Sequence, residues 1–211
     1  GVFQVDSGTI TIDGQDVTKL PEHKRAAFLG RVFQDPMMGT APTMQIEENL
    51  ALAARRGQPR GLKWGITALE RADYRELLKT LDLGLEDRLT AKVGLLSGGQ
   101  RQALTLLMAS LKQPKLLLLD EHTAALDPKT ADKVLALSDQ IVQENNLTTL
   151  MITHNMKDAI AHGNRLIMMD AGRVVVDISG EDKKKLTVPD LLALFSRASG
   201  SDEANDKMLL S

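Results

Sequence analysis

The sequence predicts an α/β fold, a parallel sheet covered by helices, with a helical subdomain inserted into it. In the second half of the chain, short apolar stretches alternate with helical patterns, which is typical of a parallel sheet. In the first half, three helical patterns follow one another without an intervening strand. A chain of 211 residues with 43% hydrophobic residues is long and apolar enough to bury such a core.

The first half begins with short strands. Residues 9–12 alternate polar and apolar types between two glycines, which predicts a strand followed by a turn. A second strand is expected at 31–34, before Asp35 and Pro36. The spacing of apolar residues then predicts three helices, at 46–56, 66–83 and 97–112. A basic loop at 57–63 separates the first two helices.

The second half predicts four strands and three helices. The strands are expected at 115–120, 148–154, 165–169 and 173–178, and the helices at 128–144, 155–162 and 189–197. We therefore divide the chain into a sheet-containing core (1–35 and 113–180), a helical subdomain (36–112) and a C-terminal helical tail (181–211). The tail opens on the charged stretch 181–185, and the polar stretch 198–206 is expected to be mobile.

Composition excludes several classes of protein. The net charge of −2 argues against a broadly basic nucleic-acid-binding surface, so no nucleic-acid partner is expected. Cysteine is absent, so the chain has neither disulfides nor a thiolate metal site. The apolar runs are too short to span a membrane. Any function at a membrane would therefore require docking onto a partner that spans it.

The run Leu96-Ser97-Gly98-Gly99-Gln100 has two possible explanations. Ser97 and Gln100 have the spacing of a capping box, which opens a helix. Two glycines in a first turn, however, cost helix stability. Gly98 and Gly99 are useful if the backbone must approach an anion, because a helix N-terminus presents unpaired N–H groups. The five residues alone leave helix capping and phosphate binding equally open.

Two carboxylates follow an apolar strand at Asp120 and Glu121. Ligands of open parallel sheets bind beyond the carboxyl ends of the strands, so both residues are candidates for a site. Asp120 could hold Mg²⁺, which prefers oxygen ligands and retains much of its water. Glu121 could orient a water molecule or accept its proton. The alternative is a strand that simply ends in solvated acids.

Three further residues are individually less informative. Asp127 precedes Pro128, which predicts a helix with aspartate at its N-cap and proline in its first turn. His154 ends the expected strand at 148–154 and could contact a terminal phosphate, although a histidine at a strand end is more often an ordinary surface residue. The Gln34 amide oxygen could bind Mg²⁺ or water, but one glutamine after a strand indicates little by itself.

The order of these motifs resembles the ABC ATPase family over most of the chain, from about residue 9 to 178. Gln34 matches the glutamine loop of that family, and the stretch 97–100 matches its signature motif. Asp120 and Glu121 match the Walker B aspartate and the catalytic glutamate. Asp127 matches the aspartate loop, and a later residue, at 154, matches the switch histidine.

The resemblance implies specific roles for these residues. Glu121, His154 and Gln34 would act in catalysis, while Asp120 and Gln34 would bind Mg²⁺. In this family a nucleotide site forms between two subunits. Ser97, Gly98, Gly99, Gln100 and Asp127 would therefore contact ATP that is held by the partner subunit. ATP and Mg²⁺ are the implied cofactors.

The resemblance also implies an assembly and a location. The fold would be that of a P-loop NTPase, with a RecA-like core at 1–35 and 113–180. The expected partners are a second ABC ATPase subunit in a homodimer and integral membrane permease subunits. A periplasmic or extracellular solute-binding protein would be an indirect partner. The chain would lie in the cytoplasm, on the inner face of the cell membrane, and would power solute import.

Two features depart from the family pattern. No G-x-x-x-x-G-K-[ST] sequence occurs, so we expect the N-terminal strands and the phosphate-binding loop to be missing and this chain alone to lack ATPase activity. His122 stands where the family usually has proline. The sequence around His122, together with the basic loop near Lys63, is similar to sequences of an importer branch that includes proposed aromatic amino acid transporters. The alternatives are a non-transport ABC ATPase and an inactive fragment that completes a partner's site.

Overall fold

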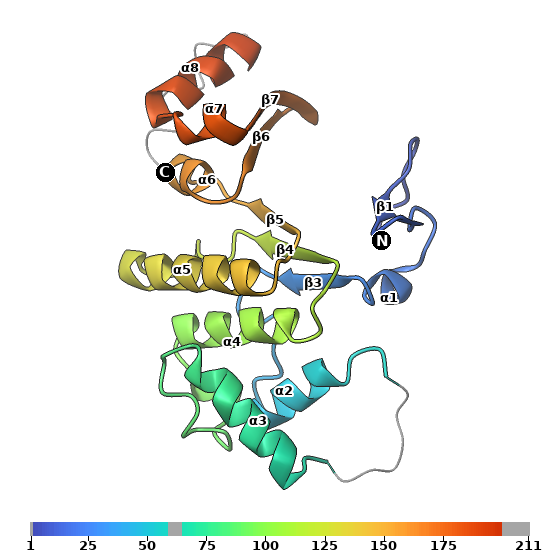
Figure 1. Cartoon of the computed structure of the whole chain (residues 1–211), viewed down its shortest axis with the longest axis vertical. Helices are drawn as coiled ribbons and strands as arrows, with labels where there is room; N and C mark the ends of the chain where they lie inside the picture. The colour runs from blue at the N-terminus through green and yellow to red at the C-terminus, as the bar shows by residue number, and fades with distance from the viewer. Residues whose placement is uncertain (1, 59–64, 200–211) are drawn as a thin grey trace. The chain divides into compact units, whose positions relative to one another are not determined.

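A computed structural model describes residues 2–58 and 65–199 of the chain. It divides into two compact units, Gly1–Ile152 and Thr153–Ser211, which are described separately below. Figure 1 shows the elements of each unit along the chain, from blue at the N-terminus to red near the C-terminus. The boundary between the units falls directly after a sheet strand, whereas the division expected from the sequence places residues 113–180 in one core.

The first unit is built on a three-stranded parallel sheet with the order β3 (Leu29–Val32), β4 (Leu116–Asp120) and β5 (Thr149–Ile152). Val32 pairs with Leu119, and Asp120 pairs with Ile152. The parallel sheet is therefore confirmed, with β4 as its central strand. The prediction of a strand at 31–34 was wrong in its bounds, because the ladder ends at Val32 and leaves Phe33 and Gln34 beyond it.

A small hairpin precedes this sheet. It joins β1 (Thr11–Ile12) to β2 (Gln15–Asp16) and is followed by the short helix α1 (Glu22–Arg25). Asp13 and Gly14 both have positive φ, 50° and 75°, as a two-residue hairpin turn requires. The turn was expected, but residues 9 and 10 lie outside the strand. Neither β2 nor α1 was predicted, since both are too short to show periodicity.

The helical subdomain contains α2 (Ile46–Ala54), α3 (Ala68–Lys79) and α4 (Gly98–Ser110). A short 3₁₀ helix, η1 (Val93–Leu95), precedes α4. Fully buried side chains from the three helices and their connections form one apolar cluster, which includes Ile46, Leu50, Leu78, Leu85 and Leu104. Burial of this kind, at about 25 cal/mol per Å² of apolar surface, provides the main stabilisation of such a helical layer.

Local capping fixes the start of α3. Thr67 Oγ1 accepts a hydrogen bond from the Glu70 N–H (3.2 Å), and a Glu70 carboxylate oxygen accepts one from the Thr67 N–H (2.8 Å). The Thr67 N–H and the Arg55 guanidinium, which both donate to the Glu70 carboxylate, lower the pKa of Glu70 to about 2. The helix predicted from residue 66 therefore begins two residues later, because Thr67 occupies the N-cap.

Helices α4 and α5 (Pro128–Glu144) pack against the sheet. Their shared core comprises Val32, Leu106, Ala109, Leu117, Leu119, Ile141 and Leu147. Gly30 permits the close approach of α4, because a Cβ atom there would lie 2.5 Å from the Ala109 carbonyl oxygen. Leu150 and Ile152 alternate with inward-facing residues of β5, and about half of each is exposed, 51% and 52%.

The second unit contains an antiparallel hairpin with three helices. Its strands are β6 (Arg165–Asp170) and β7 (Arg173–Ser179), and its helices are α6 (Met156–Ala161), α7 (Gly180–Lys184) and α8 (Val188–Ser199). Leu166, Val176 and Leu191 form its core. The buried Lys183 ammonium donates to the carbonyl oxygens of Ile160 (2.5 Å) and His162 (2.8 Å), close to the end of α6.

The C-terminal expectations are met in part. Most of the charged stretch 181–185 is helical, because it belongs to α7. The polar stretch predicted to be mobile begins inside α8, whose last residue is Ser199, and its remainder at 200–206 lies outside the described residues. The basic loop at 57–63 also falls mostly outside them. Across 2–58 and 65–199, no helix has the length and apolar character needed to cross a membrane.

Candidate functional site

The carboxylate pair lies at the carboxyl end of the central strand. Asp120 is the last residue of β4, and Glu121 follows it directly. The Glu121 N–H donates to the Ile152 carbonyl oxygen at the end of β5 (3.0 Å), so the parallel ladder holds the backbone up to this point. Both side chains are partly exposed, as groups that bind a ligand from solvent must be. This is the sheet edge at which open α/β folds bind ligands.

Glu121 has an unusual backbone conformation. Its φ is 43°, in the left-handed region that residues other than glycine seldom adopt. Its carbonyl oxygen accepts a hydrogen bond from the Ala124 N–H (3.0 Å), which closes a tight turn directly after the strand. Backbone of this kind occurs in ordinary turns, as at Asp13 and Ala171, and also clusters at functional sites.

Asp120 has a partner that the sequence did not suggest. An Arg31 Nη2 atom donates to Asp120 Oδ2 (3.0 Å), and the guanidinium lies over the Phe33 ring, 4.4 Å from its centroid. Arg31 pairs with Leu118 across the ladder, so Asp120 lies two positions further along on the same face. Both side chains are well exposed, which makes the pair a weak contributor to stability. The position of Arg31, within a strand of small and apolar residues, was the sequence feature that could have indicated a charged partner for it.

Gln34 lies two residues beyond β3 and is exposed. The segment that contains it is held against α4 at two points. Gln102, which is fully buried, donates through Nε2 to the Phe33 carbonyl oxygen (3.0 Å). At Gly39, an added Cβ atom would lie 2.4 Å from the methyl group of Thr105. Gln102 was also missed, although a glutamine among apolar helix positions is itself a sign of a specific role.

The predicted capping box at the start of α4 is confirmed. Ser97 Oγ accepts from the Gln100 N–H (3.3 Å), and Gln100 Oε1 accepts from the Ser97 N–H (3.2 Å). The Gln100 amide also donates to the Leu83 carbonyl oxygen (3.3 Å). Both ends of the Gln100 amide group are thus used in holding the loop, while Ser97 is exposed at the helix start.

The two glycines of this motif have different surroundings. Gly98 is exposed, whereas Gly99 is buried against the first turn of α5. A Cβ atom on Gly99 would lie 2.2 Å from the Thr130 methyl carbon, and one on Gly98 would lie 3.3 Å from a Leu126 methyl carbon. Close helix packing is therefore a sufficient reason for glycine at position 99. Phosphate binding by this motif stays a prediction.

Asp127 caps α5 as predicted, with proline in the first turn. Its Oδ1 atom accepts from the Thr130 N–H (3.1 Å), and hydrogen bonds from Thr130 hold the pKa of the Asp127 carboxyl below its usual value. The side chain is exposed and stays ionised at neutral pH. The same Thr130 contacts Gly99, so α4 and α5 begin side by side.

His154 belongs to the second unit and is exposed. The expectation that a strand continues to His154 was wrong, because β5 ends at Ile152. Asn155 follows as the N-cap of α6 and accepts from the Lys157 and Asp158 N–H groups, which gives the chain a new direction after the strand. The proposed phosphate contact of His154 stays a prediction.

The donor set at the end of β4 suits Mg²⁺ in its chemistry. Asp120 and Gln34 offer oxygen ligands, and Mg²⁺ usually binds one or two protein oxygens and keeps several waters. No group of three or more acidic or histidine residues that could hold a metal occurs in the described part of the chain. The Arg31 guanidinium would compete with a cation for Asp120. The residues therefore fit a water-rich magnesium site better than a closed metal cage.

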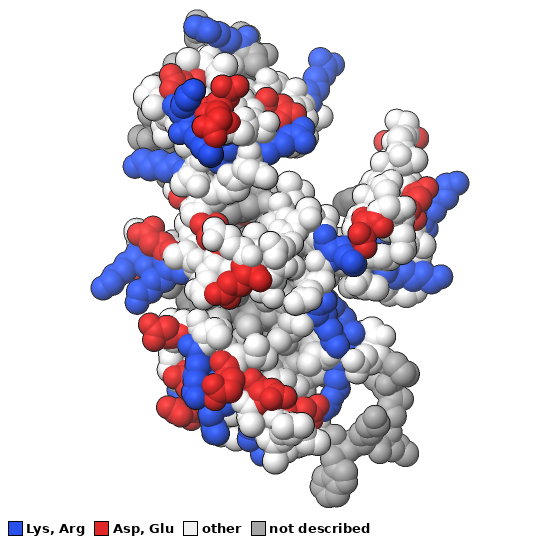
Figure 2. All heavy atoms as spheres, viewed as in Figure 1, with Lys and Arg blue, Asp and Glu red and all other residues white. Residues whose placement is uncertain are grey.

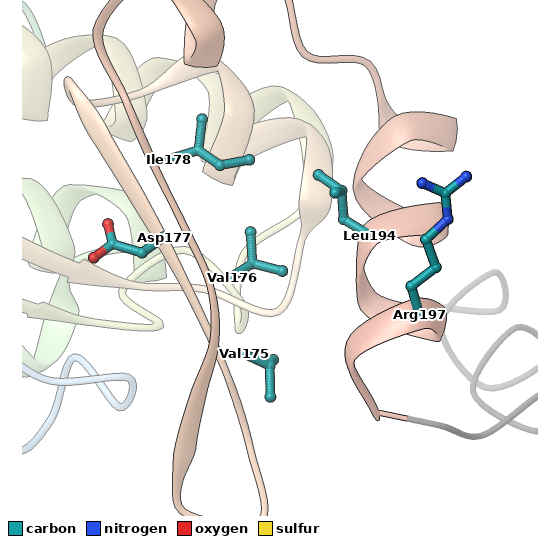
Figure 3. A pocket seen from close by; sticks show the side chains of 6 residues that line it. All are labelled: Val175, Val176, Asp177, Ile178, Leu194 and Arg197. Atoms are coloured by element: carbon teal, nitrogen blue, oxygen red, sulfur yellow. The ribbon is translucent and has the colours of Figure 1, made fainter.

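The charges on the described surface and the pocket of the second unit do not point to another catalytic site. Figure 2 shows acidic and basic side chains intermixed over the face in view. A pocket of about 380 Å³ lies in the second unit between β7 and α8, where Val176, Ile178 and Leu194 face one another beside Arg197 (Figure 3). None of the predicted site residues lines it. The carboxylate pair after β4 remains the best candidate for chemistry.

The fold and this motif order define an ATP-binding cassette of the P-loop NTPase class. Residues 1–124 match the family described as ABC transporter. The chain belongs to this family of transport ATPases. A tyrosine transport ATP-binding protein of Clostridioides difficile (strain R20291) is 48% identical over 198 residues, which cover 94% of this chain and 78% of that protein.

More distant relatives extend the comparison. The methionine import ATP-binding protein MetN of Rhizobium etli is 38% identical, over 83% of this chain and 46% of its own length. The chain thus spans about half of that relative. A dimeric ATP-binding cassette bound to ADP and phosphate superposes with a TM-score of 0.68 at 28% identity, covering 84% of this chain and 75% of that one. An ATP-binding cassette in its ADP conformation superposes with a TM-score of 0.70 at 23% identity, covering 92% of this chain and 79% of that one. This likeness supports the fold alone.

Proposed function

We propose that the chain is the ATP-hydrolysing subunit of an importer and powers solute uptake across the cell membrane. The observation that supports this most directly is the Asp120–Glu121 pair at the carboxyl end of the central strand, in a chain 48% identical to a transport ATP-binding protein. Asp120 and Gln34 would hold Mg²⁺ on the ATP phosphates. Glu121 would orient the attacking water and take its proton.

The remaining site residues act across a subunit boundary in this proposal. The exposed residues Ser97 and Gly98 lie at the N-terminus of α4, the positive end of the helix dipole, which favours an anion. They and Asp127 would contact ATP held by a second subunit, as the dimeric form of a related cassette supports. His154 would contact the terminal phosphate and respond to its loss. Buried Gly99 and the bonded Gln100 amide would shape this loop.

A membrane partner has a suitable docking place on the helical subdomain. A pocket of about 320 Å³ lies between α2 and α3. Its lining includes the partly exposed Leu52, at 51%, and the nearly buried Glu47, which Arg71 holds through two hydrogen bonds of 2.6 and 2.8 Å. An apolar rim beside a fixed charge pair suits a short helix of a permease subunit. Such docking would place the chain on the inner face of the membrane.

The transported solute is best sought among the aromatic amino acids, because the relative at 48% identity is named for tyrosine transport. Deleting the gene is expected to remove most high-affinity tyrosine uptake, and complementation with the natural gene product should restore it. The measurement is initial uptake of labelled tyrosine, with methionine and glycine betaine as control solutes. If tyrosine uptake is unchanged and uptake of a control solute is lost, the protein powers transport of that control solute and not of tyrosine.

The chain by itself is expected to bind ATP only weakly. Its sequence contains no G-x-x-x-x-G-K-[ST] motif, so the backbone cradle and the lysine that hold the β- and γ-phosphates are not present in these 211 residues. Isothermal titration of MgATP into the chain should give no binding at micromolar concentrations. Absence of binding would agree with a role in which the start of α4 contacts ATP that a partner subunit holds. Micromolar binding would contradict the expectation that the chain alone binds ATP weakly.

A further inference from the structure

We propose that His122 is a positioning residue that holds Glu121 in its active orientation through a buried hydrogen bond to Ser138. This inference rests on the proposed role of Glu121. His122 immediately follows Glu121 and is almost fully buried, with 2% of its surface exposed. Its Nε2 atom lies 2.9 Å from the Oγ atom of Ser138, which is 3% exposed and lies on α5. The loop after β4 is thereby attached to the helix that packs beneath it.

The Ser138 hydroxyl also lies 2.8 Å from the Val134 carbonyl oxygen, one turn earlier on α5. When its single hydrogen is donated to that carbonyl, its oxygen accepts from the imidazole of the tautomer that carries a proton on Nε2. Both side chains are buried. Leaving a buried polar group without a hydrogen bond costs more free energy than a formed hydrogen bond contributes to stability. The pair is therefore a strong constraint on the loop.

The constraint acts on a backbone that needs one. Glu121 has a φ of 43°, its N–H donates to the Ile152 carbonyl oxygen, and its own carbonyl oxygen accepts from the Ala124 N–H. The His122 side chain restricts this backbone through its hydrogen bond to Ser138. Loss of the bond removes that restriction from the residue directly after Glu121.

Hydrogen exchange of the intact chain tests this without any need for ATP turnover. In His122→Asn, whose shorter amide cannot reach Ser138, exchange of the Glu121 and Ala124 N–H groups should accelerate about tenfold. Ser138→Ala should do the same. In His122→Gln, whose amide nitrogen takes the place of Nε2, exchange should stay within about twofold of the native rate. The Leu117 N–H, bonded to the Thr148 carbonyl oxygen within the ladder (2.9 Å), is the internal reference.

Ile141→Val is the matched control for stability, because Ile141 lies on the same helix, in the core and away from the loop. Acceleration at Glu121 and Ala124 alone, reversed in the glutamine variant, supports the proposal. Three results would overturn it: equal acceleration at Leu117, no acceleration, or a glutamine variant that behaves like the asparagine one.

A second measurement separates this inference from the proposed function. In the ATP-hydrolysing complex, His122→Asn should lower kcat about tenfold and leave KM unchanged, with recovery in His122→Gln. If exchange at Glu121 and Ala124 rises while kcat stays constant, the His122–Ser138 bond does restrain the loop, but Glu121 is not a catalytic residue. A kcat that falls equally in Ile141→Val would show an effect of stability alone and overturn the positioning role.

Discussion

Replacing Glu121 with glutamine is expected to lower kcat for ATP hydrolysis by about 10²- to 10⁴-fold, the usual contribution of a positioned general base. The substitution keeps the shape of the side chain and its left-handed backbone while removing the carboxylate charge. Binding of ATP should persist, because the proposed role of Glu121 lies in turnover and not in holding the phosphates. The measurement is phosphate release by the protein assembled with the proposed membrane subunits.

Glu144→Gln provides the matched control for Glu121→Gln. Glu144 is exposed at the end of α5 and accepts a hydrogen bond from Gln140, which a glutamine oxygen can also accept. Its replacement removes one carboxylate from the same unit without touching the site, so turnover should stay within about twofold of the native rate. Equal turnover in the native and Glu121→Gln proteins would remove Glu121 from the catalytic role.

Gly99→Ala is expected to destabilise the chain by about 1–3 kcal/mol, the usual cost of overfilling a packed interface. The new methyl group would lie 2.2 Å from the Thr130 methyl carbon, so α4 and α5 would have to move apart. Alanine is a better helix former than glycine, which offsets up to about 1 kcal/mol of this cost. Urea unfolding of the native and variant chains measures the difference.

A second substitution distinguishes packing from phosphate binding. Thr130→Ser removes the methyl group that Gly99→Ala would overlap and leaves the backbone N–H that Asp127 caps. The double variant should recover native stability. If its ATP turnover also recovers, packing alone explains the glycine, whereas stable protein with low turnover would show that position 99 must approach a ligand. Gly98→Ala, whose nearest neighbour is a flexible Leu126 side chain at 3.3 Å, should unfold close to the native midpoint.

The candidate site was predictable where its signals are local in sequence. The capping box at Ser97, the aspartate cap at Asp127 and the acids after β4 each depend on residues within four positions of one another. Periodicity located α2, α4 and α5 because one face of each is apolar. It misplaced the ends of β3 and β5, since a ladder ends where pairing ends and not where apolar residues end.

What the sequence determined by itself was the order of strands, helices and motifs, and through that order the family. Short-range physics is sufficient for this, because caps, turns and hydrophobic periods involve neighbours along the chain. The tertiary structure alone decided that Arg31 meets Asp120, that Gln102 holds Phe33, and that His122 is bonded to Ser138. These partners are 16 to 89 residues apart. Strand pairing brings Arg31 to Asp120, and the packing of α4 and α5 brings the other two pairs into contact.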